Sequence, residues 1–150
     1  MKNKYDELRE IHQKRVNEFP LMFAFNQEQF DNGMKNWGLE PSDTDKIYSI
    51  GGGGYIRKTD LDTYNKLWED IRKEHNELIE KDKTGAGYIK DMFISELENH
   101  EYSYTRDISS TLDALELTYE DIRNNPTLKK GLDLAINEII DKNYDDYEID

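Results

Sequence analysis

The chain has 150 residues and a formal net charge of −13 at pH 7, with 35% hydrophobic and 11% aromatic residues. The sequence contains no cysteine, which excludes disulfides and thiolate metal sites, and no apolar run approaches the ~20 residues of a membrane span. The strong negative charge argues against direct binding to nucleic acid or to an anionic membrane, because like charges repel.

Length and composition also predict the organisation of the chain. We expect a single domain over residues 1–142 and an acidic, flexible tail over residues 143–150. The N-terminal residues lack the apolar stretch of a signal peptide, and a chain without cysteine suits a reducing compartment. We therefore expect a cytoplasmic protein.

The first part of the chain predicts two helices and a strand. Residues 3–18 place apolar side chains at three- and four-residue spacing, which is typical of an amphipathic helix, and Pro20 ends it. Residues 21–25 are short, apolar and aromatic, and predict a buried strand. Asn26 and Gln29 form a capping pair for a helix that ends at Gly38. Its buried face should carry Phe30, Met34 and Trp37.

The middle of the chain predicts a hairpin followed by a long helix. Residues 46–50 and 55–58 are β-prone runs on either side of four glycines, Gly51 to Gly54. Thr59 and Asp60 then supply a candidate N-cap for a helix over residues 60–82, which has the clearest apolar stripe in the sequence.

The last part of the chain is predominantly helical. Apolar spacing and caps predict helices over residues 86–100, 109–115, 118–124 and 128–142, with Thr118 as the cap of the third. Residues 102–108 fit either a strand or a loop. The fold class expected is α+β, with a small, mostly antiparallel sheet of two to four short strands covered by five or six helices.

The negative charge is concentrated late in the sequence. Residues 96–150 contain 15 acidic and five basic residues, a net charge of −10, whereas the first 95 residues carry −3. This asymmetry indicates a non-enzymatic protein that binds a protein partner through a basic, nucleic-acid-binding groove of that partner. Alternatively, these charges only keep the surface of the protein solvated and bind no partner. The carboxylates predicted to face the partner are Glu96, Glu98, Glu101, Glu116, Glu120 and Asp121.

The glycine run supports a competing hypothesis, in which the chain is an enzyme or a ligand-binding protein. Backbone N–H groups of Gly51, Gly52, Gly53 and Gly54 are candidates to bind an anionic ligand together with Arg57 and Lys58. Neither established glycine-rich phosphate motif is present, however, and a hairpin turn explains the same residues.

No residue pattern indicates a catalytic, cofactor or metal site. Glu96 and His100 share a helix face next to Glu101, but they supply too few metal ligands, and a histidine at a helix end commonly caps it. Nucleophile motifs of hydrolases are absent. We therefore expect no catalytic residue, no metal and no cofactor.

Several segments together resemble a known family. They are Phe23-Ala24-Phe25-Asn26, Gln29-Phe30, residues 50–58, Asn99-His100-Glu101-Tyr102, and residues 111–115 followed by Leu117-Thr118. The chain resembles an uncharacterised family of small acidic proteins from phages and mobile elements of Gram-positive and gut bacteria, over about residues 5–140. The resemblance assigns no catalytic residue. It implies a setting in which small acidic proteins inhibit host defence, anti-CRISPR proteins among them, so that the expected partner is a basic host protein such as a nucleic-acid-binding nuclease. It leaves the oligomeric state open.

Overall fold

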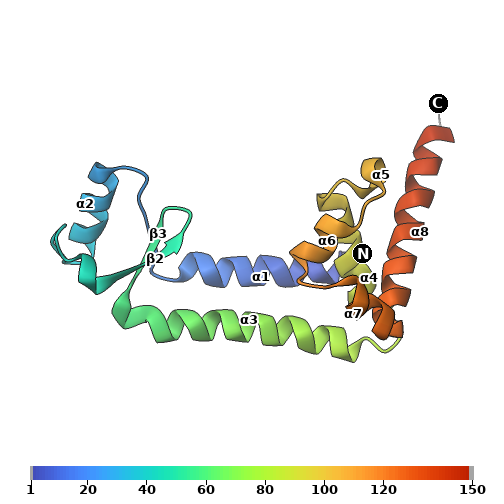
Figure 1. The fold of residues 1–150 in the computed structure, drawn as a ribbon, viewed down its shortest axis with the longest axis horizontal. Helices are drawn as coiled ribbons and strands as arrows, with labels where there is room; N and C mark the ends of the chain where they lie inside the picture. Colours follow the sequence, from blue (N-terminus) through green and yellow to red (C-terminus); the bar gives the residue numbers. More distant parts are fainter. Residues whose placement is uncertain (1, 149–150) are drawn as a thin grey trace. The chain divides into compact units, whose positions relative to one another are not determined.

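The computed structural model describes the backbone of residues 2–148 and the side chains of residues 2–143. Its contacts group the chain into two compact units: unit 1 contains Met1–Ile11 and Glu74–Asp150, and unit 2 contains His12–Lys73. Helices α1 (Lys4–Glu18) and α3 (Leu61–Lys81) each contribute residues to both units (Figure 1). The division into two units argues for two domains, whereas the two continuous helices that they share argue for one. The expectation of one domain over residues 1–142 therefore stays a prediction.

Unit 2 contains the sheet. Strands β1 (Met22–Phe23), β2 (Ile47–Gly51) and β3 (Gly54–Arg57) form an antiparallel sheet in the order β1-β3-β2. The hairpin predicted around the glycines is confirmed as β2 and β3. Helix α2 (Gln27–Asn36) follows β1, and short 3-10 turns precede β2 (Thr44–Lys46) and follow β3 (Lys58–Asp60).

The core of unit 2 is small. Met22, Met34 and Ile47 form a buried cluster, against which Phe30 and Trp37 pack as half-buried side chains. Alternation along β3 places Ile56 on the opposite face of the sheet, where it is fully buried. The apolar face predicted for α2 is thus confirmed.

The prediction of a buried strand over residues 21–25 is wrong in extent. Only Met22 and Phe23 pair as a strand, and Phe23 and Phe25 are 56% and 75% exposed. The physical reason is that successive side chains of a strand point to opposite faces, so Met22 packs in the core of unit 2 while Phe23 lies on the other face and remains more than half exposed. Phe25 instead lies over the glycine turn, where a Cβ atom on Gly53 would approach its ring to 2.5 Å.

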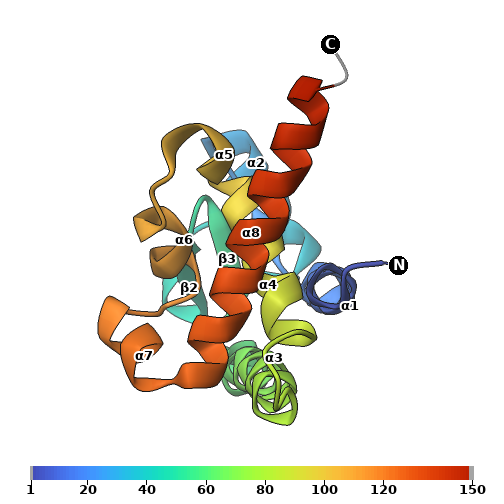
Figure 2. The same cartoon turned by 90° about the vertical axis from the view of Figure 1, so that its right-hand side faces the viewer.

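Unit 1 is helical throughout the part that the structure describes. Apart from the ends of α1 and α3, it consists of α4 (Tyr88–Asn99), α5 (Tyr102–Thr105), α6 (Ser109–Ala114), α7 (Tyr119–Asn124) and α8 (Pro126–Glu148) (Figure 2). Residues 102–105, for which the sequence favoured a strand or a loop, form a single helical turn. Helix α8 begins with proline at its first position, where no N–H is needed.

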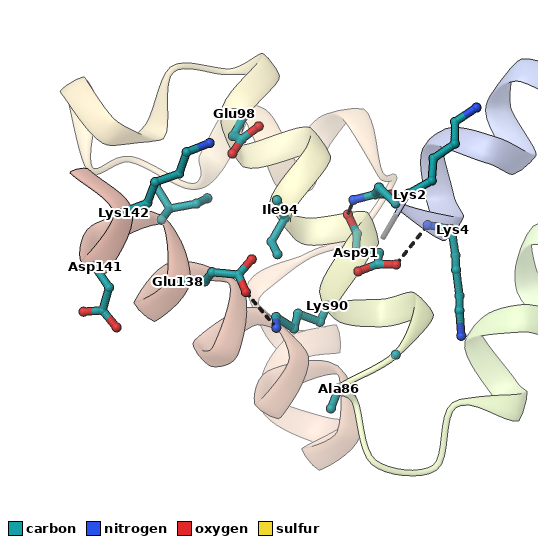
Figure 3. A pocket seen from close by; sticks show the side chains of 13 residues that line it. Lys2, Lys4, Ala86, Lys90, Asp91, Ile94, Glu98, Glu138, Asp141 and Lys142 are labelled. Atoms are coloured by element: carbon teal, nitrogen blue, oxygen red, sulfur yellow. Dashed lines mark hydrogen bonds and ion pairs between the residues drawn. The ribbon is translucent and has the colours of Figure 1, made fainter. Parts of the chain in front are cut away.

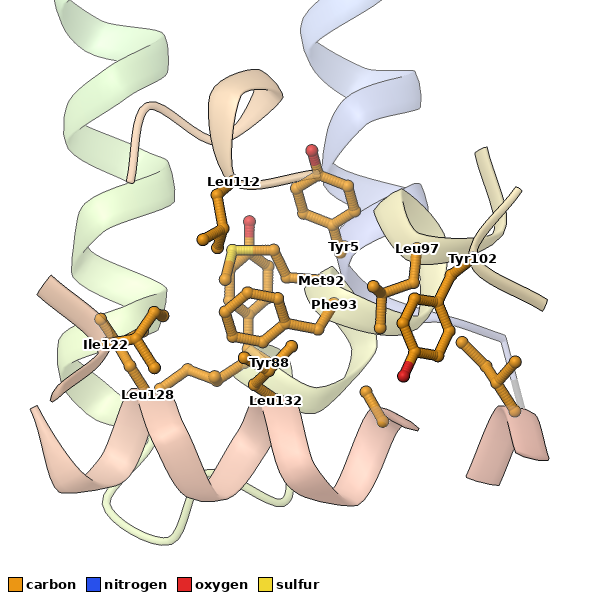
Figure 4. Packing of buried hydrophobic residues seen from close by; sticks show 13 residues of the cluster. Tyr5, Tyr88, Met92, Phe93, Leu97, Tyr102, Leu112, Ile122, Leu128 and Leu132 are labelled. Carbon is orange, nitrogen blue, oxygen red and sulfur yellow. The ribbon is translucent and has the colours of Figure 1, made fainter. Parts of the chain in front are cut away.

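Helix α4 forms the centre of the unit 1 core. Met92, Phe93 and Leu97 are fully buried, and α8 lies against them with Leu128, Leu132, Ala135 and Ile139 (Figure 4). This cluster has 13 buried residues, against three in unit 2. Unit 1 therefore contains most of the apolar surface that stabilises the fold.

The loop between α3 and α4 is built around one carboxylate. Asp82 Oδ1 accepts the Gly85 N–H at 3.0 Å and the Thr84 N–H at 3.3 Å, while Oδ2 accepts the N–H groups of Gly87 at 3.1 Å and Ile89 at 3.0 Å. Partial burial alone would raise the pKa of Asp82, but these four donors outweigh it and lower the pKa.

The α+β class and the small antiparallel sheet are confirmed. The described residues contain eight α-helices rather than five or six. The short helices α6 and α7 match predicted segments, whereas α5 was not predicted as a helix. Residues 143–148, within the predicted tail, continue the backbone of α8, since no glycine or proline follows Lys142 to end it. Residues 149–150 lie outside the described part. Within residues 2–148, no helix combines the length and the apolar character required to cross a bilayer.

Candidate protein-binding surface

Glu96, the first of the six predicted partner-binding residues, lies inside unit 1. It is 5% exposed, and its Oε1 accepts hydrogen bonds from Arg9 Nη1 at 2.8 Å, Tyr5 Oη at 3.2 Å and Asn99 Nδ2 at 3.3 Å. Burial, reinforced by the Glu96 charge, raises the pKa of Tyr5 to about 12. Glu96 thus holds the start of α1 against α4 and is not available to a partner in this arrangement.

The start of α1 is attached to α4 by further polar contacts that the sequence analysis missed. Ser95 Oγ donates a hydrogen bond to Asp6 Oδ1, and Asn3 Nδ2 donates to the Asp91 carbonyl at 2.8 Å. All of these pairs join residues more than 80 positions apart in the sequence. No local pattern identifies such pairs.

The C-terminal end of α4 is capped by the histidine that the sequence suggested. His100 Nδ1 lies 2.8 Å from the Glu96 carbonyl oxygen, to which the buried Thr111 Oγ1 also donates at 3.3 Å. The capping interpretation of His100 is therefore confirmed. Over the described residues, no group of three His, Asp or Glu side chains has the arrangement needed to hold a metal ion.

Glu98 and Glu101 lie at the junction between α4 and α5. Both are exposed, and neither has an ion-pair partner among residues 2–143. Glu101 has a left-handed backbone with φ of 58°, which ends α4 sharply and separates it from α5. Tyr104 in α5 is 86% exposed beside them.

Glu116, Glu120 and Asp121 lie at the other end of unit 1, where α6 leads into α7. Figures 1 and 2 both place α5 and α7 on opposite sides of α6. Asp121 is exposed but already engaged: its Oδ2 accepts the Thr118 N–H at 2.9 Å, while its own N–H donates to Thr118 Oγ1 at 3.0 Å. The capping role predicted for Thr118 is confirmed, and Glu116 and Glu120 remain exposed without ion-pair partners among the described side chains.

The six predicted residues therefore form two exposed groups and one buried site. Between the exposed groups, Asp113 on α6 is a further exposed carboxylate that the sequence analysis did not select. Exposed Tyr104 and Tyr119 accompany the two groups, one at each end. We use "acidic surface" below for Glu98, Glu101, Asp113, Glu116 and Glu120.

The charge of the two units differs strongly. Unit 2 contains ten acidic and nine basic residues, a net charge of −1, so that unit 1 carries −12 of the total −13. Of the 15 carboxylates after residue 95, Glu96 is buried and four lie in residues 144–150. The remaining ten are all on the exposed surface of unit 1.

A groove of about 850 Å³ lies between the N-terminal residues, α4 and α8 (Figure 3). Its walls carry both charges: Lys90 Nζ lies 2.9 Å from Glu138 Oε1, and Asp91 Oδ2 accepts the Lys4 N–H at 2.9 Å. Four lysines and four carboxylates line the groove together with apolar side chains such as Ile94, so its charge favours neither an anion nor a cation.

The glycine run predicted as an alternative anion site forms the turn of the hairpin in unit 2. Gly51, Gly52 and Gly53 have φ of 87°, 58° and 79°, values that favour glycine, so the turn itself requires them. Arg57 lies at the far end of β3, where its Nε donates to Asp60 Oδ2 at 2.8 Å and its guanidinium stacks over Trp37. Lys58 is exposed in the following turn. This geometry separates the predicted cations from the glycine N–H groups.

Comparison with known families agrees with the resemblance in finding a family of unknown function, while the origin in phages or mobile elements stays a prediction. A model of DUF7659, a family of unknown function, matches residues 4–138. The chain belongs to this family. The DUF7659 match spans residues of both units, so the helical unit and the sheet-containing unit are both part of the family. No curated protein and no solved structure matches the chain.

Proposed function

We propose that this DUF7659 protein is a non-enzymatic inhibitor, encoded by a phage or mobile element, that binds a basic host defence protein. Its acidic surface would occupy a nucleic-acid-binding groove in the manner of an anti-CRISPR protein, with carboxylates in place of phosphates. The observation that carries the proposal is the segregation of charge, −12 in unit 1 against −1 in unit 2.

The arrangement of the acidic surface supports this role. Glu98, Glu101 and Asp113 project from α4, α6 and the junction after α4, elements held by the buried core of unit 1. Carboxylates on such elements lose little conformational freedom on binding, which preserves affinity. Because no internal cation neutralises Glu98, Glu101, Glu116 or Glu120 among the described residues, their field can act on a partner.

The proposal is tested by salt-dependent association with host proteins. The full chain is immobilised and exposed to host lysate at low and at high salt, and the captured proteins are identified. We expect a basic, nucleic-acid-binding protein whose association rate falls steeply with salt, because steering acts over a Debye length of about 8–10 Å. Nucleic acid should compete for the captured partner. Recovery of no basic partner, or binding that ignores salt, would contradict the proposal.

A matched pair of variants separates the acidic surface from net charge. Replacing Glu98, Glu101, Glu116 and Glu120 by glutamine removes four negative charges from unit 1. Replacing Glu18, Glu28, Glu40 and Glu69, which are exposed in unit 2, by glutamine removes the same charge elsewhere. If each exposed carboxylate contributes about 0.5 kcal/mol to binding, the first variant should lose at least tenfold in affinity. The second variant should lose much less.

A further inference from the structure

The outer edge of the sheet in unit 2 has the features of a peptide-binding strand. Strand β2 pairs with β3 on one side, and the order β1-β3-β2 leaves its other side at the edge of the sheet. The strand Ile47-Tyr48-Ser49-Ile50-Gly51 contains no charge and no proline, the usual protections of an exposed edge. Tyr48 is 49% exposed, and Ser49 is exposed.

The pairing of β1 with β3 determines which backbone groups of β3 face each neighbour. The Ala24 N–H donates to the Gly53 carbonyl at 2.9 Å, and the register places Met22 opposite Tyr55 two residues along. Ala24 and Gly53 thus form a hydrogen-bonded pair, and such pairs recur at every second residue of an antiparallel ladder. Met22 and Tyr55 form the next pair, so the N–H and carbonyl groups of Tyr55 point toward β1. Those of Ile56 must then point toward β2.

The same alternation identifies the free groups of β2. Tyr48 lies opposite Ile56 and uses its N–H and carbonyl within the ladder, so the backbone groups of Ile47 and Ser49 point outward. Outside the ladder, no backbone or side-chain partner among the described residues accepts or donates a hydrogen bond at these two positions. An irregularity between Ser49 and Gly51 bends the strand at its glycine end, which limits the free edge to residues 47–49.

We infer that residues 47–49 bind an extended peptide segment of a partner protein as an additional strand, with a basic residue at one end. The basic preference follows from the residues just before β2, where Glu40, Asp43 and Asp45 accompany one cation, Lys46. Lys46 Nζ lies 3.6 Å from Asp43 Oδ1, so the other two carboxylates remain for the peptide. Main-chain hydrogen bonds would supply affinity, and contact with Tyr48 would favour an apolar side chain.

A second copy of this chain fits the edge less well than a peptide. An edge of three residues buries far less than the roughly 1,200 Å² of a stable interface between folded proteins. Each copy would also bring a net charge of −13 to its partner. This peptide site belongs to unit 2 and does not depend on the acidic surface of unit 1.

The test is selection from a phage-displayed library of random eight-residue peptides against the immobilised full chain. We expect enriched peptides in which β-branched or aromatic residues alternate and a lysine or arginine lies at one end. Ser49→Pro removes an outward N–H without removing a ladder hydrogen bond, whereas Ser49→Thr retains it. Enriched peptides should bind S49T like the unmodified chain and bind S49P about tenfold or more weakly.

Amide exchange in the unmodified chain provides a readout that does not depend on a variant folding. The Ile47 and Ser49 amides should exchange fast alone and slowly with a selected peptide, while Tyr48 is protected in both states. Absence of enrichment, equal binding to S49P, or unchanged exchange at Ile47 and Ser49 would each overturn the inference. A dimer in sedimentation equilibrium that S49P abolishes would also overturn it, in favour of pairing between two copies.

Discussion

Units 1 and 2 differ in both charge and core. Unit 1 has a net charge of −12 over a cluster of 13 buried apolar residues, and unit 2 has −1 over a cluster of three. Repulsion among surface carboxylates destabilises a compact state, and a large apolar core compensates for it. The comparison indicates that unit 1 tolerates an acidic surface because of its core, whereas unit 2 presents exposed phenylalanine side chains and a free strand edge.

The largest expected effect comes from removing the ring at the centre of unit 1. Phe93 is fully buried, so Phe93→Ala should lower the free energy of unfolding by about 3–5 kcal/mol. Both tryptophans, Trp37 and Trp68, lie in unit 2 and report on it by fluorescence, while far-UV circular dichroism reports on all helices. We expect both signals to shift together, because α1 and α3 continue through both units.

Met34→Ala is the counterpart in unit 2. Met34 is fully buried, so its replacement should lower the free energy of unfolding by about 2–5 kcal/mol. The fluorescence and circular dichroism transitions should again shift together. If Phe93→Ala moved the circular dichroism transition and left the tryptophan transition in place, or if Met34→Ala moved the tryptophan transition and left most of the circular dichroism transition in place, the chain would contain two independently unfolding domains. That result would contradict the prediction of one domain over residues 1–142.

The Asp82 loop should make unit 1 sensitive to acid. Asp82→Asn replaces an acceptor of four N–H groups by an amide that has one acceptor oxygen, and should cost about 2 kcal/mol at neutral pH. The pKa of Asp82 is lower in the folded state than its ordinary value, so its stabilisation is present above that value and is lost as pH falls through the folded pKa.

Urea unfolding of both proteins from pH 7 to pH 2 measures this effect. The difference between the unmodified chain and D82N should shrink once the pH falls below about 4, the ordinary pKa of aspartate. A difference that stays constant down to pH 2 would show that contacts other than those of the Asp82 carboxylate hold the loop.

Glu96 and Glu98 provide a direct comparison between a buried and an exposed carboxylate on one helix. Glu96→Gln weakens the contacts to Arg9 and Tyr5 and should cost about 1–2 kcal/mol in thermal or chemical unfolding. Glu98→Gln, at an exposed position, should stay within about 0.5 kcal/mol of the unmodified chain. Equal effects would mean that the attachment of α1 to α4 contributes nothing measurable.

The smallest effect is expected from removing residues 143–150. The deletion removes four carboxylates, Asp145, Asp146, Glu148 and Asp150, and should change the free energy of unfolding by less than about 0.5 kcal/mol. The association rate with a basic partner should fall moderately at low salt, since steering depends on total charge. A decrease of several degrees in melting temperature would instead assign these residues to the packing of unit 1.

Local chemistry in the sequence was enough to predict most of the elements. The Asn26 cap, with Asn26 Oδ1 accepting the Gln29 N–H at 2.8 Å, the capping pair at Thr118, and the glycine hairpin all depend on neighbours within a few residues. The apolar stripe of α4 was equally readable, because helical periodicity alone places Met92, Phe93 and Leu97 on one face.

Tertiary structure alone decided which predicted surface residues are on the surface. Glu96 and Glu98 are two residues apart and chemically identical, yet Glu96 is buried because Tyr5 and Arg9, about 90 positions earlier, meet it across α1 and α4. Phe25 is an apolar aromatic residue typical of a core but is 75% exposed, because it follows the paired residues of β1 and lies over the glycine turn instead of in the core. Periodicity determines which face of an element is apolar, whereas burial depends on what lies opposite that face.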